Sequence, residues 1–128
     1  VRHDGTWFLN PNVTGQLHTY FSSGQVTLAD DATVTLTSIA NTGALISVGS
    51  YKNRNNGAAY THGLFWCQYG IGETGVVILA DPGSNFSTSD TDGRVCVQCA
   101  AGSANVTIKN RVGASNNISI TVHRYQGL

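Results

Sequence analysis

The sequence predicts an all-β protein, and three observations point to that class. Gly, Ser, Thr and Asn make up about two fifths of the 128 residues, whereas Met is absent and Glu occurs once. This composition favours turns and lacks the straight-chain residues that cover helix surfaces. Apolar and polar residues alternate with a period of two in several short segments, which is typical of strands. No stretch has the 3.6-residue period of a substantial amphipathic helix.

Strands and turns follow one another at short, fairly regular spacing after residue 24. The last strand is the clearest, because Ile118, Ile120 and Val122 point to one side and the polar residues between them point to the other. Turn signals such as Asn56-Gly57 separate the strands. We therefore expect about eight strands in an antiparallel, jelly-roll-like β-sandwich of two four-stranded sheets. The expected strands are residues 25–29, 32–37, 44–50, 62–69, 75–80, 94–100, 105–109 and 117–124.

The first 23 residues differ from the rest, because they have turn signals and no sustained alternation. They also carry four large aromatic side chains: Trp7, Phe8, Tyr20 and Phe21. Aromatic side chains of this size are normally buried, so these four are expected to dock against this domain or a neighbouring chain. The expected organisation is an irregular N-terminal arm or linker at 1–23, with room for one short strand, and a β-sandwich domain at 24–128.

Charge and hydrophobicity exclude two classes of partner. Only 11% of the residues are charged, and seven Lys/Arg balance seven Asp/Glu. Nucleic-acid binding depends on clustered basic residues, so no nucleic-acid partner is expected. No apolar run approaches the ~20 residues of a membrane-spanning helix, so no membrane insertion is expected. The chain begins at Val1 without a signal segment, and we expect a processed protein or a piece of a longer one.

The three cysteines, Cys67, Cys96 and Cys99, do not form the even set of a disulfide framework, and buried thiols are expected. Cys96 and Cys99 have a zinc-like spacing, but residues three apart on a strand point to opposite sides. A nucleophilic pair of Cys67 with His62 or His123 stays open as an alternative. We expect no metal and no cofactor.

Carboxylates are scarce, which argues against hydrolytic chemistry. The segment that begins at Asp90 resembles the start of a calcium loop, but Ala101 stands where an EF-hand has its Glu. A turn explains that segment equally well. A glycosidase pair of Glu73 with Asp81 or Asp92 remains an alternative, because loops bring distant residues together. We expect that the protein is not an enzyme.

The polar loop 51–60 is the candidate ligand site. A flat ring can stack on the face of a sugar, while amide and cationic groups hydrogen-bond its hydroxyls. An ordinary solvated loop is the commoner use of such residues. The candidate glycan-binding residues are Tyr51, Lys52, Asn53, Arg54, Asn55, Asn56 and Tyr60.

The segment 26–34 (VTLADDATV) resembles small β-sandwich modules of bacteriophage virion proteins such as tail fibres, tail spikes and head fibres. The closing segment 108–113 (IKNRVG) and the strand after it also look like theirs, and the layout matches over residues 24–124. The resemblance implies a structural or attachment module on the virion surface, usually a homotrimer, with other virion proteins as partners. These modules share no catalytic residues, so none are carried over. The aromatic arm would then connect the module to the particle.

Three functions follow in order of preference. The first is a non-enzymatic virion structural or attachment module that self-associates and contacts a host surface glycan. The alternative is a free-standing, lectin-like carbohydrate-binding β-sandwich protein. The third is a fragment of a polysaccharide hydrolase.

Overall fold

The computed structural model describes residues 6–8, 18–37, 43–52, 58–68, 75–99 and 104–126. These residues form ten strands and no helix. None of them belongs to a helix that could cross a membrane. The strands are β1 (Thr6–Phe8), β2 (His18–Leu28), β3 (Thr33–Leu36), β4 (Ala44–Lys52), β5 (Ala58–Cys67), β6 (Val76–Ala80), β7 (Phe86–Ser87), β8 (Val95–Cys99), β9 (Val106–Asn110) and β10 (Asn116–Gln126).

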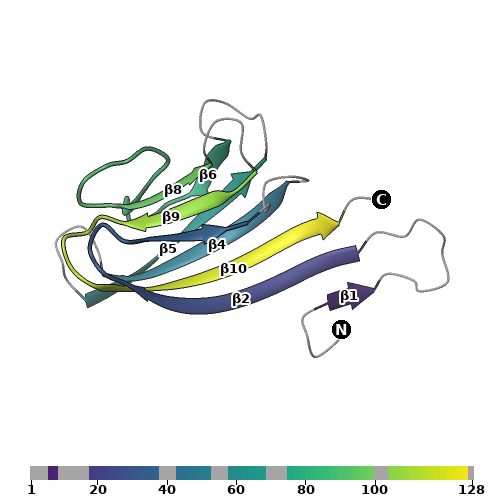
Figure 1. Ribbon diagram of the computed structural model, residues 1–128, viewed down its shortest axis with the longest axis horizontal. Coiled ribbons are helices and arrows are strands. Elements are labelled where there is room, and N and C mark those ends of the chain that lie inside the picture. Colours follow the sequence, from purple (N-terminus) through teal and green to yellow (C-terminus); the bar gives the residue numbers. More distant parts are fainter. Residues whose placement is uncertain are drawn as a thin grey trace.

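Two sheets pack face to face, which confirms the predicted all-β sandwich (Figure 1). The larger sheet has the order β1-β2-β10-β4-β5-β6, and the smaller sheet has the order β3-β9-β8-β7. Every described strand pair is antiparallel except β7 with β8. All eight expected strands are present, and β1 and β7 add to them. The sheets therefore hold six and four strands rather than four each.

The order of the strands shows how the chain crosses between the sheets. β2 pairs with β10 in the larger sheet, and β3 pairs with β9 in the smaller sheet. The connection from β2 to β3 and the connection from β9 to β10, where the chain passes between the sheets, therefore lie side by side. Paired connections of this kind are found in jelly rolls. β4, β5 and β6 instead form a meander within the larger sheet. Short connections keep consecutive antiparallel strands adjacent, and this explains the larger sheet's extra width.

The N-terminal part of β2 crosses the boundary that we expected between residues 23 and 24. Its pairing with β10 continues without a break from Leu28 opposite Asn116 to His18 opposite Gln126. The backbone groups of a strand as long as β10 need partners, and β2 supplies them despite its turn-like sequence. Trp7 and Phe8 lie on β1, and Tyr20 and Phe21 lie on β2. The side chains of these four residues, whose docking was expected, lie outside the described part of the structure.

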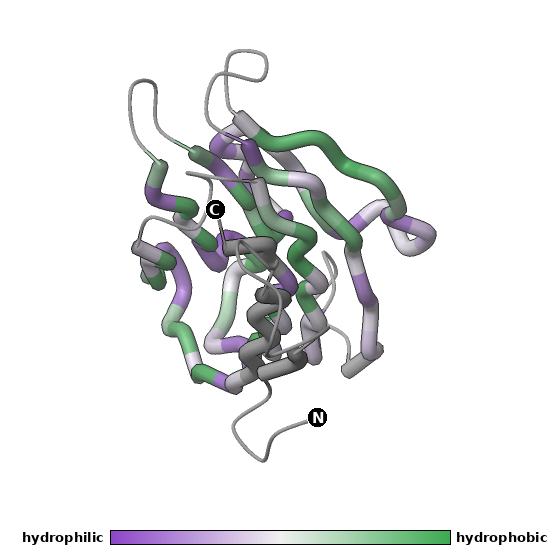
Figure 2. Tube along the Cα trace, turned by 90° about the vertical axis from the view of Figure 1, so that its right-hand side faces the viewer, coloured by the Kyte–Doolittle hydropathy of each residue, from purple (hydrophilic) through white to green (hydrophobic). Residues whose placement is uncertain are grey.

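The core lies between the sheets and follows the alternation along each strand. On β10, Ile118, Ile120 and Val122 are all buried, as predicted. On β9, Val106 and Ile108 are fully buried and alternate with half-buried residues. Burying each such side chain contributes about 1.5–3 kcal/mol. Figure 2 shows the resulting alternation of colours along most strands and, in contrast, an unbroken hydrophobic run on β6.

Candidate functional site

The outer face of the larger sheet carries a shallow depression of about 60 Å³. Its lining comes from four adjacent strands, β2, β10, β4 and β5, because their core-facing positions alternate with positions on this face. Strands hold side chains more precisely than loops do, so the groups in this depression are pre-positioned. We call the lining residues the tyrosine cluster: Gln25, Gly49, Ser50, Tyr51, Tyr60, His62, Asn117 and Ser119.

Two aromatic rings form one wall of the tyrosine cluster. Tyr51 and Tyr60 meet edge to face, with ring centroids 5.0 Å apart and ring planes at 67°. The Tyr60 side chain is 77% exposed, the most of any large hydrophobic side chain described. Edge-to-face contact is a favourable arrangement, so Tyr51 holds Tyr60 as an exposed flat surface.

The floor of the depression depends on Gly49. In the register of the sheet, Gly49 lies between Ser119 on β10 and His62 on β5. A Cβ atom at this position would collide with Ser119 Oγ and would lie 3.0 Å from His62 Nε2. Glycine therefore lets these two side chains approach each other above the backbone.

The polar groups of the tyrosine cluster retain unused hydrogen-bonding capacity. The Thr27 hydroxyl donates to Asn117 Oδ1 at 2.7 Å, which orients the amide and leaves its N–H groups for another acceptor. Among the described residues, no side-chain hydrogen bond engages Gln25, His62 or Ser119. Donors and acceptors beside an exposed ring are the chemistry that sugar hydroxyls require.

No Lys, Arg, Asp or Glu occupies an outward position of β2, β10, β4 or β5 where side chains are described. We call these positions the uncharged face. At these described positions a ligand meets polar, aromatic and aliphatic side chains but no Lys, Arg, Asp or Glu. The described positions are Gln25, Thr27, Leu45, Ser47, Gly49, Tyr51, Tyr60, His62, Leu64, Trp66, Asn117, Ser119, Thr121 and His123.

The structure brings together only part of the predicted loop site. Tyr51 and Tyr60 are in contact because β4 and β5 form a hairpin. Lys52 contributes its backbone to a buried network, in which its N–H donates to Asn116 Oδ1 at 2.9 Å. The predicted residues Asn53, Arg54, Asn55 and Asn56 lie outside the described residues.

The remaining members of the cluster, on β2, β4, β5 and β10, were not among the glycan-binding residues predicted from the sequence. The alternation of the last strand already put Asn117 and Ser119 on its polar side. What no local pattern shows is that β10 lies beside β4, which brings these residues close to Tyr51.

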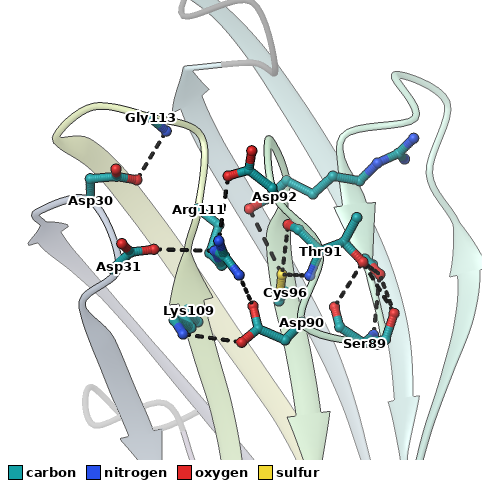
Figure 3. Close-up of polar contacts among 12 residues, drawn as sticks. Asp30, Asp31, Ser89, Asp90, Thr91, Asp92, Cys96, Lys109, Arg111 and Gly113 are labelled. Atoms are coloured by element: carbon teal, nitrogen blue, oxygen red, sulfur yellow. Dashed lines mark hydrogen bonds and ion pairs between the residues drawn. The ribbon is translucent and has the colours of Figure 1, made fainter.

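Several of the described charged side chains gather around Arg111, next to the smaller sheet (Figure 3). Arg111 Nη1 lies 2.6 Å from Asp90 Oδ1, and its Nε lies 3.1 Å from Asp31 Oδ1. Lys109 Nζ lies 3.2 Å from Asp90 Oδ2. Hydrogen bonds from Arg111 and Lys109 lower the pKa of Asp90, and the bond to Asp90 raises the pKa of Arg111.

This charge cluster ties turns to β9 and to the segment that follows it. Asp31 and Asp90 belong to different turns, and both turns are joined to Arg111. Asp30 Oδ1 accepts a hydrogen bond from the Gly113 N–H at 3.0 Å, which ties a third segment to the first turn. The described residues include no group of three His, Cys, Asp or Glu placed to hold a metal ion. Asp90 and Asp92, the aspartates of the segment that resembles a calcium loop, face the cationic side chains of Arg111 and Lys109.

All three cysteines are buried: Cys67 lies on β5 of the larger sheet, and Cys96 and Cys99 lie on opposite sides of β8 in the smaller sheet. Cys99 belongs to the core, whereas Cys96 Sγ accepts a hydrogen bond from the Thr91 N–H at 3.3 Å outside it. Burial, with a smaller contribution from nearby Cys99, raises the pKa of Cys67 to about 12. A protonated thiol is a poor nucleophile.

The Cys–His alternative does not assemble among the described residues, whereas the glycosidase alternative includes a residue outside them. Cys67 points into the core, whereas His62 and His123 occupy outward positions, so no Cys–His pair forms. Asp81 accepts the backbone N–H groups of Asn85 and Phe86 at 3.0 and 3.1 Å, which stabilises a turn. The other members of the suggested glycosidase pair are Glu73, which is outside the described residues, and Asp92, which faces Arg111 at 3.5 Å.

Comparison with known proteins gives no relative: no family model, curated protein or solved structure matches the chain. The class that the fold defines is an all-β sandwich.

Proposed function

We propose that this chain is a non-catalytic attachment module that contacts a surface glycan through its tyrosine cluster. The observation that carries the proposal is the Tyr51–Tyr60 pair. It stands beside polar side chains that make no hydrogen bond to another described residue, on a face whose described outward positions hold no Lys, Arg, Asp or Glu. The exposed Tyr60 ring offers a flat surface for the C–H face of a pyranose. Gln25, His62 and Asn117 offer donors and acceptors for its hydroxyls.

The rigidity of the cluster supports a binding role. Each side chain in it comes from a strand of the larger sheet, and the Tyr51 ring braces Tyr60. A pre-positioned site loses less conformational entropy on binding than a mobile loop. Weak individual contacts to sugar hydroxyls can therefore add up to useful affinity.

The virion setting rests on the resemblance of residues 26–34 and 108–113 to phage fibre and spike modules. Such modules act as several copies on one particle, which multiplies weak glycan contacts into strong attachment. In this setting the chain is a self-associating structural module, with a homotrimer as the expected form and other virion proteins as neighbours.

The edge strand β6 supports self-association. Val77, Ile78 and Leu79 are 41%, 37% and 53% exposed, and among the described strands β6 has a neighbour in the sheet on one side only. A hydrophobic edge strand presents apolar side chains and unpaired backbone groups that a second chain can cover. Light scattering at micromolar concentration should therefore give a multimer for the wild-type chain and a lower mass for Leu79→Lys. A strictly monomeric wild-type chain would instead favour the free-standing lectin-like alternative.

A glycan array followed by titration tests the binding proposal. The matched variants are Tyr60→Ala, which removes the ring, and Tyr60→Phe, which keeps it. We expect Tyr60→Ala to weaken binding at least about tenfold and Tyr60→Phe to retain most of it. Circular dichroism checks that all three proteins are folded. An array without a binder, or equal binding by Tyr60→Ala, would remove the proposal.

A further inference from the structure

A second aromatic side chain lies on the same face of β5 as Tyr60. On β5, Gly63, Phe65 and Cys67 are buried on the core side of the strand. The alternate positions, Tyr60, His62, Leu64 and Trp66, therefore face outward. Tyr60 and Trp66 are therefore on one face, about 20 Å apart at roughly 3.3 Å per residue. His62 and Leu64 lie between them on the same face of the strand. This distance is far longer than one sugar ring.

The structure holds Trp66 in place. Its indole N–H donates to Gln68 Oε1 at 3.1 Å. Its six-membered ring lies against Gly43, where a Cβ atom would be only 2.8 Å from Cζ2. Gly43 also has a φ of +87°, a conformation that favours glycine. The half-buried ring is thus fixed between Leu45 on β4 and Val77 on β6, its partners in the register.

We infer that the ligand is an extended, uncharged polysaccharide that lies along β5 and contacts Tyr60 and Trp66 with different sugar units. This inference rests on the proposed glycan-binding function and specifies its ligand class. Two separated rings on one face of the sheet suit an internal stretch of a polymer. A single terminal sugar would need one ring and an enclosing pocket, whereas the depression at Tyr60 is shallow and small.

The described outward positions of this face hold no Lys or Arg, and this favours a neutral ligand. Acidic polysaccharides are bound through Arg and Lys, which form charge-assisted hydrogen bonds with carboxylate or sulfate groups. No such side chain occupies the described outward positions of β2, β10, β4 or β5. Lys109 and Arg111 are on β9 and just after it, and they are paired with aspartates.

The experiment titrates the wild-type chain with neutral oligosaccharides of graded length and with an acidic polymer. The probes are the monosaccharide, trisaccharide and hexasaccharide of each neutral glycan that the array identifies, with polygalacturonate as the acidic comparator. We expect the hexasaccharide to bind at least about tenfold more tightly than the monosaccharide. We also expect its affinity to change less than about twofold between low and high salt, because no exposed charge pair is made.

Variants separate the two contact points. Trp66→Ala should weaken the hexasaccharide about tenfold and leave the monosaccharide unchanged, whereas Tyr60→Ala should weaken both. Trp66→Phe keeps a flat ring and serves as the matched control. Ser47→Lys provides a second test that leaves the Trp66 packing intact. It places a bulky side chain beside Leu64, its partner in the register, midway between the two rings, and should weaken only the hexasaccharide.

The outcomes distinguish the inference from the proposed function. Equal affinity for all lengths, or tighter, salt-dependent binding of polygalacturonate, would overturn the extended neutral ligand while leaving glycan binding in place. Failure of every saccharide to bind would overturn both. A change of light-scattering mass on Trp66→Ala, without saccharide binding, would assign this face to a second copy of the chain and also overturn the inference.

Discussion

Phe65 of the larger sheet and Phe86 of the smaller sheet meet edge to face in the core, with ring centroids 5.4 Å apart and ring planes at 74°. Gly63 makes room for this pair. A Cβ atom on Gly63 would lie 2.7 Å from Phe65 Cζ and 2.8 Å from Phe86 Cδ2. The two aromatic rings and the glycine together set how closely the sheets approach at this point.

Truncation of Phe86 should therefore be costly. We expect Phe86→Ala to lower the free energy of unfolding by about 3–5 kcal/mol, because a buried ring is lost and a cavity remains. Phe86→Leu, which refills much of the volume, should cost markedly less. Urea denaturation of the three proteins measures this, and a loss below about 1 kcal/mol for Phe86→Ala would contradict the packing described.

Asn110 should be as important as a core apolar residue. It is fully buried, and its Nδ2 lies 3.0 Å from Leu28 O and 2.8 Å from Ala114 O. Asn110→Ala leaves these carbonyls without a donor and should cost about 1–3 kcal/mol. Asn110→Asp should cost more, because an acceptor then faces the carbonyl oxygens. The exposed Asn117→Asp is the control in the same denaturation assay, and an equal effect at both positions would refute this account.

The buried thiol of Cys67 should make stability depend on alkaline pH. Its pKa is raised to about 12 in the folded chain, against 9.0 for an unperturbed thiol. Above pH 9 the unfolded chain loses this proton while the folded chain keeps it. The contribution of the protonated Cys67 thiol to the free energy of unfolding is therefore complete below pH 9. It is lost as the pH rises from about 9 to about 12. The difference in unfolding free energy between wild type and Cys67→Ala should shrink across this range, and a constant difference would count against it.

The Asp90 carboxylate should stabilise the folded chain at neutral pH and not in acid. Its pKa is lowered by Arg111 and then Lys109, so the folded state favours the carboxylate. This contribution is present above the unperturbed pKa of 3.8 and is lost as the pH falls below it. Asp90→Asn should reduce thermal stability at pH 7 in low salt and have little effect at pH 2. Asp92→Asn is the matched control, because Asp92 is 90% exposed and 3.5 Å from Arg111. Equal effects of the two variants at pH 7 would be inconsistent with this geometry.

Gly49 and Ser119 should be coupled. Gly49→Ala forces the Ser119 hydroxyl to move and should cost about 1–3 kcal/mol. In Ser119→Gly the obstructing atom is absent, so the same alanine should cost less. A double-mutant cycle of unfolding free energies measures the coupling, which we expect at about 0.5–3 kcal/mol. Strict additivity would show that the two positions do not contact each other.

Alternation, short apolar runs and the turn signals between them were sufficient to predict the eight longer strands and the sandwich class. It did not predict β7, because a two-residue strand has no period. Nor did it predict that β2 begins at His18, because Ser22, Ser23 and Gly24 favour turns locally. The long β10 strand overrides that preference by supplying hydrogen-bond partners, which is a tertiary effect.

The candidate site was predictable only where its residues are close in sequence. Tyr51 and Tyr60 belong to one hairpin, so a local segment contained both. Asn117 is far from Tyr51 and Tyr60 in the sequence. Its hydrogen bond to Thr27, which is 90 positions away, likewise joins distant parts of the chain. One sequence without its topology does not show which strands become neighbours, so such residues could be found only from the fold.

The register of β2 and β10 has a practical consequence. Because His18 pairs with Gln126, the beginning of β2 and the end of β10 lie side by side in the larger sheet. A sandwich with this layout could be spliced into a surface loop of a host protein without pulling the loop's ends apart. The same proximity makes a short engineered linker between these two strands a route to circular permutants.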